Sequence, residues 1–270
     1  MKILIKNKDI NEALKKVSNL GFVPTMGCLH KGHEYLIKQS KMKCNQTLVS
    51  IFINPTQFNN KKDYLSYPKN LKKDLNILKK LKIDYVYLPK VIDIFNYKKK
   101  LDIKLFKKDK ILCAKFRKGH FEGVLEVMDS LTYLIKPKKI FMGEKDYQQL
   151  YLVKKFIEKR YKSKIIACKT VRDRNNLALS SRNLLLTNKQ KLLAGKLTMK
   201  IMELKYFVKK HKNIRSLIKL KKKEFDKKFK IKIEYLDIRN IINLKKTKSI
   251  KNSRIFIAFY VGKVRLIDNF

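Results

Sequence analysis

The stretch PTMGCLHKGHEYL, from Pro24 to Leu36, decides how the rest of the chain is interpreted. The residues Gly21–Thr25 favour a short strand, and the pattern from Gly32 to Lys43 is typical of a helix. A strand that turns directly into a helix presents the N-terminal amides of the helix at the strand end, where they favour phosphate. Gly27 and Gly32 let the backbone approach such a ligand closely. The stretch therefore predicts a strand–turn–helix unit that binds an anion.

Two histidines, His30 and His33, stand three residues apart in this unit. At that spacing both imidazoles can share one face of the helix N-terminus. There they could hydrogen-bond a negative charge that develops during a reaction. The competing interpretation is structural, with His30 in the core and His33 capping the helix. The Pro-Thr-Met-Gly lead and the strand–turn–helix context favour the functional interpretation.

Outward from this unit, the first two-thirds of the chain alternate strand and helix patterns. Strands are expected at Thr47–Ile53, near Ile83, at Lys139–Met142 and at Ile165–Val171; helices are expected at Leu71–Leu81, Phe121–Ile135 and Tyr147–Tyr161. This alternation predicts an α/β fold with a doubly wound parallel sheet. Such sheets bind ligands at the carboxyl ends of their strands.

The pattern changes after Val171, where helices are no longer interleaved with strands. Helices are expected at Asn188–Lys210 and Ile214–Phe229, followed by strands beginning near Ile233 and Arg254. This order predicts a smaller α+β C-terminal domain. We expect domains at residues 1–171 and 172–270, joined at the polar loop around Arg172–Asn176.

Two further segments carry polar groups at strand ends. In VSIFINPTQF, Val49–Phe58, Gln57 can offer both a donor and an acceptor to a hydroxyl-bearing carboxylate, although an ordinary polar turn fits as well. In FMGEKDYQQL, Phe141–Leu150, Lys145 stands near a helix start, where the helix dipole disfavours a cation. A ligand phosphate would justify that lysine; the alternative is an acidic cap with a solvated charge cluster.

A fourth segment, VRDRNNLALSSRN, covers Val171–Asn183. Ser180, Ser181 and Arg182 could form a short clamp for a polyphosphate, or simply a capped turn before the next helix. The sequence contains no G-x-x-x-x-G-K-[ST] motif, which excludes a P-loop mechanism.

The composition indicates the cellular compartment and the classes of partner that the protein can bind. The formal net charge is +45, and nine arginines leave 58 lysines spread along the 270 residues. Such a charge would suit nucleic acid, but its even spread favours a codon bias toward A and T. In so lysine-rich a chain, the arginines at 117, 172 and 182 indicate places that need a planar fork of donors. Four scattered cysteines and the lack of a long apolar stretch favour a cytoplasmic protein without a membrane partner.

Taken together, the four segments resemble the pantothenate synthetase (pantoate–β-alanine ligase) family, as do RKGHFEGV at Arg117–Val124 and VRLIDN at Val264–Asn269. The resemblance covers nearly the whole chain, in the right order. It implies a nucleotidyltransferase fold related to class I aminoacyl-tRNA synthetases, with H-K-G-H as the H-I-G-H counterpart and the C-terminal domain as a lid. It also implies a homodimer that condenses (R)-pantoate with β-alanine through a pantoyl adenylate. ATP would bind with Mg²⁺ held mainly by its phosphates, and no specific nucleic acid would be bound.

The resemblance also assigns residues. His33, His30 and Lys145 would be catalytic, with His33 as the proton donor. Gln57 would contact pantoate and β-alanine, Gln149 would contact pantoate, and Asn54 and Arg117 would support the substrate pocket. The ATP site would consist of Met26, Gly27, Cys28, Leu29, His30, Lys31, Gly32, His33, Gly143, Glu144, Lys145, Asp146, Val171, Leu179, Ser180, Ser181 and Arg182.

The chain departs from the family pattern at several positions. Lys118 replaces a proline, Lys62 replaces an acidic residue, and Asn175-Asn176 replaces Asp-Gly. Asp74 is then the remaining candidate for a protein ligand to magnesium, although a metal held by phosphates fits better. Two other functions remain open: a different H-x-G-H nucleotidyltransferase, which the Asn-Pro-x-Gln-Phe and Gly-Glu-Lys-Asp segments disfavour, and an RNA-binding protein. The aromatic residues are not arranged as stacking platforms beside basic residues, which disfavours the latter.

Overall fold

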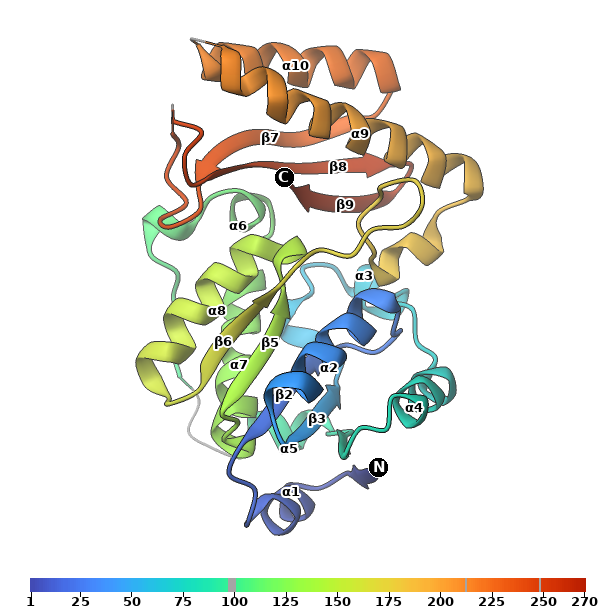
Figure 1. Ribbon diagram of the computed structural model, residues 1–270, viewed down its shortest axis with the longest axis vertical. Helices are drawn as coiled ribbons and strands as arrows, with labels where there is room; N and C mark the ends of the chain where they lie inside the picture. The colour runs from blue at the N-terminus through green and yellow to red at the C-terminus, as the bar shows by residue number, and fades with distance from the viewer. Residues whose placement is uncertain (97–100, 212, 248) are drawn as a thin grey trace. The chain divides into compact units, whose positions relative to one another are not determined.

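The computed structural model describes residues 1–96, 101–211, 213–247 and 249–270, which divide into two compact units, 1–170 and 171–270 (Figure 1). The first unit is built on six parallel strands in the order β1-β4-β3-β2-β5-β6. Their bounds are β1 Lys2–Leu4, β2 Leu20–Thr25, β3 Gln46–Ile51, β4 Tyr85–Tyr87, β5 Lys139–Gly143 and β6 Lys164–Cys168. From β2 the chain winds outward through β3 and β4, then returns to β5 on the other side of β2. The doubly wound parallel sheet is thus confirmed.

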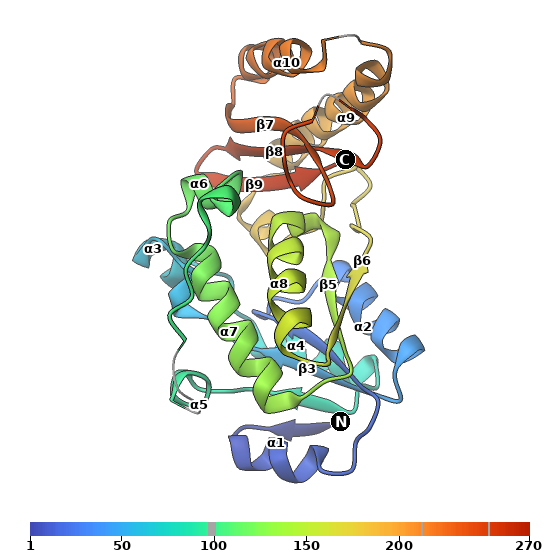
Figure 2. The ribbon, with the colours of Figure 1, turned by 90° about the vertical axis from the view of Figure 1, so that its left-hand side faces the viewer.

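Helices cover both faces of this sheet. Helix α2 (Lys31–Lys43) lies on one face, and α7 (His120–Ile135) and α8 (Tyr147–Arg160) lie on the other (Figure 2). Because the central strands are covered on both sides, their residues are apolar in continuous runs, as in the buried Phe22 and Val23 of β2. The remaining helices are α1 Asn7–Leu14, α3 Lys61–Leu65, α4 Leu71–Lys80, α5 Val91–Phe95 and α6 Cys113–Phe116, with 3₁₀ turns η1 Pro55–Gln57, η2 Lys107–Asp109 and η3 Glu144–Asp146.

The second unit is the expected α+β arrangement. Helices α9 (Asn188–Lys210) and α10 (Ile214–Phe229) lie on one face of an antiparallel sheet in which β8 is central (Figure 1). The strands are β7 Lys232–Asn240, β8 Ser253–Val261 and β9 Val264–Asn269, and a 3₁₀ turn, η4, spans Ser181–Leu185. Helix α9 begins at a capping box in which the Thr187 hydroxyl accepts from the amide of Gln190.

The structure differs from the sequence predictions at strand ends and at short elements. Strand β3 ends at Ile51 rather than Ile53, because Asn54 caps a 3₁₀ turn that opens with Pro55. Strand β6 ends at Cys168 rather than Val171. The edge strand β1 and helix α1 were not predicted. Among the described residues, no helix combines the length and the apolar character needed to cross a membrane.

Candidate active site

Three loops of the first unit gather at one edge of its sheet. Strands β3, β2 and β5 are neighbours and run parallel, so their carboxyl ends meet at the same edge. The first loop, which we call the histidine loop, is Met26–His33 after β2. The second begins at Asn54 after β3, and the third is Glu144–Asp146 after β5. The chain reverses its winding direction at β2, which is where doubly wound sheets bind ligands.

The backbone of the histidine loop is held by a buried carboxylate. The Cys28 amide donates to Asp74 Oδ2 at 2.8 Å, and the Leu29 amide donates to Oδ1 at 2.7 Å. Gly27 and Cys28 both have positive φ, 77° and 52°, and a Cβ on Gly27 would lie 3.0 Å from Asp74 Oδ2. Asp74 itself is only 2% exposed. The carboxylate therefore fixes a tight turn in which a non-glycine residue adopts an unfavourable left-handed conformation.

His30 and His33 are joined to one another through the start of α2. His30 Nδ1 accepts from the Gly32 amide at 3.1 Å, and His33 Nδ1 accepts from the His30 amide at 3.3 Å. The two rings lie 4.1 Å apart between centroids. His30, rather than His33, is thus the N-cap of the helix. Because each Nδ1 is an acceptor, each neutral ring carries its proton on Nε2 and can donate from that atom.

Both imidazoles are neutral at neutral pH. Burial lowers the pKa of His33 to about 3, and the charges of His30 and Lys145 act in the same direction. Burial also lowers the pKa of His30 to about 4, with a further contribution from Lys145 and an opposing one from Asp146. Each neutral imidazole can donate its Nε2–H to charge that develops on a bound phosphate.

Lys145 brings a positive charge to this pair from the third loop. Its ammonium lies 3.5 Å from Asp146 Oδ2, and its side chain is 17% exposed. Glu144–Asp146 forms the 3₁₀ turn that leads into α8. His33 and Lys145 are more than 100 residues apart in the chain, but their loops follow the neighbouring strands β2 and β5. The charge of Lys145 therefore contributes to the lowered pKa of His33.

The two glutamines that open α8 differ in their surroundings. Gln148 is buried and donates to the carbonyls of Asp109 and Ile111, at 3.2 and 2.7 Å. Gln149, the residue expected to contact pantoate, is half-buried. Gln148 thus fastens a neighbouring segment, while Gln149 remains accessible in the first turn of the helix.

The second loop is joined directly to the histidine loop. Gln57 Nε2 donates to Met26 Sδ at 2.7 Å, and Asn54 Nδ2 lies 3.4 Å from Gln57 Oε1. Asn54 is buried; its amide nitrogen donates to the Gly123 carbonyl at 3.0 Å. Two residues expected at the substrate pocket, Asn54 and Gln57, are thus brought together, with Asn54 orienting the loop from beneath.

The position of Gln57 is also set through its backbone by helix α7. His120 Nδ1 lies 2.7 Å from the Gln57 carbonyl, and Arg117 lies 2.8 Å from His120 Nε2 and 3.4 Å from the same carbonyl. A Cβ on Gly123 would come within 2.6 Å of the Thr56 carbonyl, so only glycine allows this close packing. The side chain of Arg117 therefore contacts the main chain of Gln57.

The remaining expected residues belong to the second unit, in the loop Val171–Arg182, which we call the serine–arginine loop. The Leu179 amide donates to the Val171 carbonyl at 2.9 Å, and Arg172 pairs with Ala178 in an antiparallel bridge. Ser180 then caps η4 by accepting from the Arg182 amide at 3.3 Å. Ser180, Ser181 and Arg182 directly follow the base of this hairpin.

Two of the departures from the family pattern, Asn176 and Lys118, fall at positions that accept them. Asn176, with φ 65°, occupies a left-handed turn, a conformation that asparagine tolerates better than most residues. Lys118 is exposed. The side chain of Lys62 lies outside the described part of the chain.

Asp74, the candidate metal ligand from sequence, serves as the anchor of the histidine loop in this structure. Each of its oxygens accepts from a backbone amide, and the side chain is buried. Within the part of the chain that the structure describes, no three His, Cys, Asp or Glu side chains come together as a metal site would require.

Sequence reasoning missed three residues that shape the site: Asp74 as a loop anchor, His120 and Gly123. The last two lie in the segment RKGHFEGV, from which only Arg117 was selected. Their partners are 63 and 67 residues away in the chain, at Gln57 and Thr56. No local sequence pattern indicates contacts between residues so far apart in the chain.

This chain is similar to known proteins over nearly its whole length. The family model described as pantoate-beta-alanine ligase matches residues 2–270. A pantothenate synthetase of Francisella tularensis subsp. mediasiatica is 40% identical over 268 residues, covering 97% of this chain and 92% of the relative. The crystal structure of pantothenate synthetase from Thermus thermophilus superposes with a TM-score of 0.92 at 27% identity, covering 100% of this chain and 99% of that one. A pantoate-beta-alanine ligase from Francisella tularensis, complexed with beta-gamma ATP and beta-alanine, superposes with a TM-score of 0.81 at 37% identity over 100% and 97% of the two chains.

Proposed function

This chain belongs to the pantoate-beta-alanine ligase family, and we propose that the histidine loop, its two neighbours and the serine–arginine loop together carry out that ligase reaction. The enzyme uses ATP to condense pantoate with β-alanine, giving pantothenate, AMP and pyrophosphate. The observation that carries the site assignment is the neutral His30–His33 pair beside Lys145 at the carboxyl end of β2.

In the first half-reaction, a carboxylate oxygen of pantoate attacks the α-phosphorus of ATP, and pyrophosphate leaves. Negative charge grows on the phosphate oxygens as the transition state forms. The Nε2–H groups of His33 and His30, the ammonium of Lys145 and the N-terminal amides of α2 would stabilise that charge. Met26, Gly27, Cys28, Leu29, Lys31, Gly32, Gly143, Glu144 and Asp146 would complete the nucleotide site in the first unit.

In the second half-reaction, the amine of β-alanine attacks the carbonyl carbon of pantoyl adenylate, and AMP leaves. Gln57 and Gln149 would hold pantoate, with Gln57 also near β-alanine, and Asn54 and Arg117 would support Gln57 from behind. Holding both reactants in one site would supply much of the rate enhancement.

The second unit would act as a lid that adds contacts to the ATP phosphates. Val171, Leu179, Ser180, Ser181 and Arg182 would provide these contacts, with the guanidinium of Arg182 able to bridge two phosphate oxygens. The boundary expected from sequence, between residues 171 and 172, differs by one residue from the division into compact units.

Magnesium would accompany ATP as the phosphate-bound ion. With Asp74 committed to backbone amides, the described residues do not fit a protein cage for the metal, so no step above depends on a protein–metal contact. We also propose a cytoplasmic homodimer. Light scattering should then give about twice the chain mass of 32.1 kDa, and a mass near 32.1 kDa would contradict the dimer.

The reaction can be tested by omitting substrates in turn. With ATP, Mg²⁺ and pantoate alone, we expect about one equivalent of pyrophosphate per active site and no sustained release of AMP. Adding β-alanine should start steady production of AMP and pantothenate. Steady AMP production without pantoate would contradict the proposed reaction.

A further inference from the structure

The terminal motif VRLIDN is tied to the serine–arginine loop by one guanidinium, that of Arg172. Arg172 Nη1 lies 2.6 Å from Asp268 Oδ2, and Nη2 lies 2.9 Å from Oδ1, so the ion pair is bidentate. The same two nitrogens donate to the carbonyls of Asn176 at 3.0 Å and Asn269 at 3.4 Å. One side chain thus joins both sides of its own loop to the last strand, β9.

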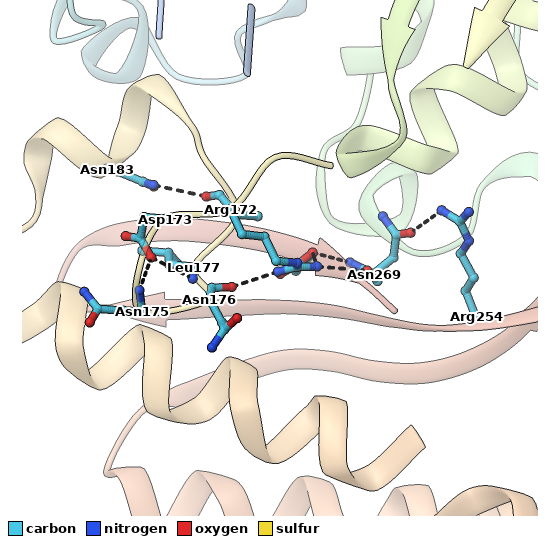
Figure 3. A network of polar contacts seen from close by, with 10 residues as sticks. Arg172, Asp173, Asn175, Asn176, Leu177, Asn183, Arg254 and Asn269 are labelled. Carbon is cyan, nitrogen blue, oxygen red and sulfur yellow. Dashed lines mark hydrogen bonds and ion pairs between the residues drawn. The ribbon is translucent and has the colours of Figure 1, made fainter. Parts of the chain in front are cut away.

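Asp268, the acceptor in this ion pair, is buried and held by contacts of its own. The side chain of Asp268 is 3% exposed, and its Oδ1 also accepts from the Asn269 amide at 2.8 Å. Arg254 Nη1 donates to Asn269 Oδ1 at 2.8 Å, which fixes the end of β9 to β8 (Figure 3). The ring of Phe270 lies 4.8 Å from the guanidinium carbon of Arg172. The carboxylate is therefore fixed in position before the loop is attached to it.

Hydrogen bonds within the loop connect Arg172 to the segment Ser180–Arg182. Asp173 Oδ1 accepts from the amides of Asn175 and Leu177, at 2.8 and 3.0 Å, and its own amide donates to the Leu177 carbonyl. The Asn183 side chain donates to the Ala178 carbonyl at 3.0 Å. A displacement of Arg172 would be transmitted along this hairpin to Ser180–Arg182.

A lysine could not replace Arg172 here. The planar guanidinium makes four hydrogen bonds, two to a carboxylate and two to carbonyls, whereas an ammonium is a point charge with three donors. In a chain with 58 lysines, an arginine at this position agrees with a need for the planar fork.

We propose that Arg172 and Asp268 are positioning residues for ATP: they lock the serine–arginine loop onto the C-terminal sheet, so that Ser180–Arg182 is held in one conformation before the nucleotide binds. This inference rests on the proposed function for the role of the loop, but the lock itself concerns only residues of the second unit. It assigns a role to the VRLIDN motif, whose contribution to the reaction was otherwise unexplained.

Two conservative variants test the lock, with a matched control. Arg172→Lys keeps the charge and removes the fork, and Asp268→Asn keeps the shape and removes the charge. Arg265→Lys breaks an equivalent pair on the same strand, in which Arg265 Nε lies 3.2 Å from Glu234 Oε2. The KM and kcat are measured with ATP, pantoate and β-alanine varied separately, together with hydrogen–deuterium exchange of the peptide covering 171–183 in the unliganded protein.

We expect each test variant to raise the KM for ATP about tenfold, a loss on the order of a charge-assisted hydrogen bond, with little change in the KM for pantoate or β-alanine. Exchange in 171–183 should accelerate, while exchange in β7 and β8 stays the same. The double variant Arg172→Lys/Asp268→Asn should be no worse than either single variant, because both remove the same interaction. Arg265→Lys should keep the ATP KM and the exchange of this peptide.

An unchanged ATP KM in folded Arg172→Lys would overturn the inference, and so would an equal rise in the KM of all three substrates. If the wild type made no pantothenate, the proposed function would fail. The exchange experiment, which needs no substrate, would still decide whether the pair locks the loop.

Discussion

The histidine loop and the serine–arginine loop are anchored by opposite chemistry. In the histidine loop, the anchor is an anion outside the loop, Asp74, and it holds the loop only by backbone amides. In the serine–arginine loop, the anchor is a cation within the loop, Arg172, which reaches out to Asp268. The first arrangement leaves every side chain of the loop for other contacts. The second commits one side chain and relies on a short hairpin to position its neighbours.

This difference suggests a division of tasks. A backbone shaped by a buried carboxylate, with two neutral imidazoles at the start of a helix, suits a fixed site where charge develops during chemistry. A loop held by an ion pair at its base, with Ser180, Ser181 and Arg182 at its end, suits binding of a polyphosphate. Substitutions in the histidine loop should therefore affect the chemical step, and those in the serine–arginine loop should affect ATP binding.

The largest effect should come from His33→Ala. If its Nε2–H stabilises the adenylation transition state, the first half-reaction should slow by about 10²–10³-fold, as for loss of one preorganised donor. Pantoate-dependent exchange of pyrophosphate into ATP measures this step. His211→Ala, which alters an exposed histidine at the end of α9, serves as the control. Near-normal exchange by folded His33→Ala would remove His33 from the chemical step.

Asp74→Asn should have the next largest effect, because it tests whether the backbone anchor matters. An amide side chain can accept from only one of the two loop amides, which leaves the other buried and unpaired at a cost of about 1–3 kcal/mol. We expect kcat/KM for ATP to fall about 10- to 100-fold. Asp84→Asn is the matched control, since Asp84 Oδ2 accepts from one backbone amide, that of Thr47 at the start of β3. Equal losses in both variants would show general destabilisation rather than an effect on the histidine loop.

Arg182→Lys should act on binding rather than on chemistry. Replacing a fork of donors by a point charge should weaken ATP use about tenfold, or 1–2 kcal/mol, without changing the KM for pantoate. Arg174→Lys, at an exposed position of the same loop, provides the control. Wild-type ATP kinetics in Arg182→Lys would mean that this arginine does not contact the phosphates.

Lowering the pH should have the smallest effect, and that effect is on the free energy of unfolding. It should arise in the histidine loop and not in the serine–arginine loop, because residues 171–182 contain no histidine. His30 and His33 have folded pKa values of about 4 and 3, below the ordinary value of 6.5. The unfolded state then binds more protons below pH 6.5, so the free energy of unfolding falls as pH decreases from about 6.5 toward 4. Each ring contributes at most about 1.4 kcal/mol per pH unit.

The variant His30→Asn tests this pH dependence, because asparagine keeps a capping acceptor but cannot be protonated. Urea unfolding at several pH values between 7 and 4.5 should show a shallower loss of stability in this variant than in the wild type. Identical slopes would contradict the lowered pKa of His30.

The sequence predicted the parallel sheet, and it selected candidate site residues, because both leave local patterns. Strand–helix alternation indicated the doubly wound order, and the short motifs selected His30, His33, Gln57 and Lys145. The contacts of the two anchors were missed because the partners are distant in the chain: Asp74 lies 46 residues from Cys28, and Arg172, although selected as an arginine in a lysine-rich chain, lies 96 residues from Asp268. Strand β1 was missed because three residues give too short a run for a period-two pattern.

The adenylate route is the central claim, and isotope transfer tests it most directly. Pantoate labelled with ¹⁸O in its carboxylate is converted to pantothenate in the presence of ATP, Mg²⁺ and β-alanine, and the products are analysed by mass spectrometry. If a carboxylate oxygen attacks the α-phosphorus and is released with AMP, each AMP should carry one ¹⁸O and pyrophosphate should carry none. Unlabelled AMP, or label in pyrophosphate or inorganic phosphate, would contradict the route through a pantoyl adenylate.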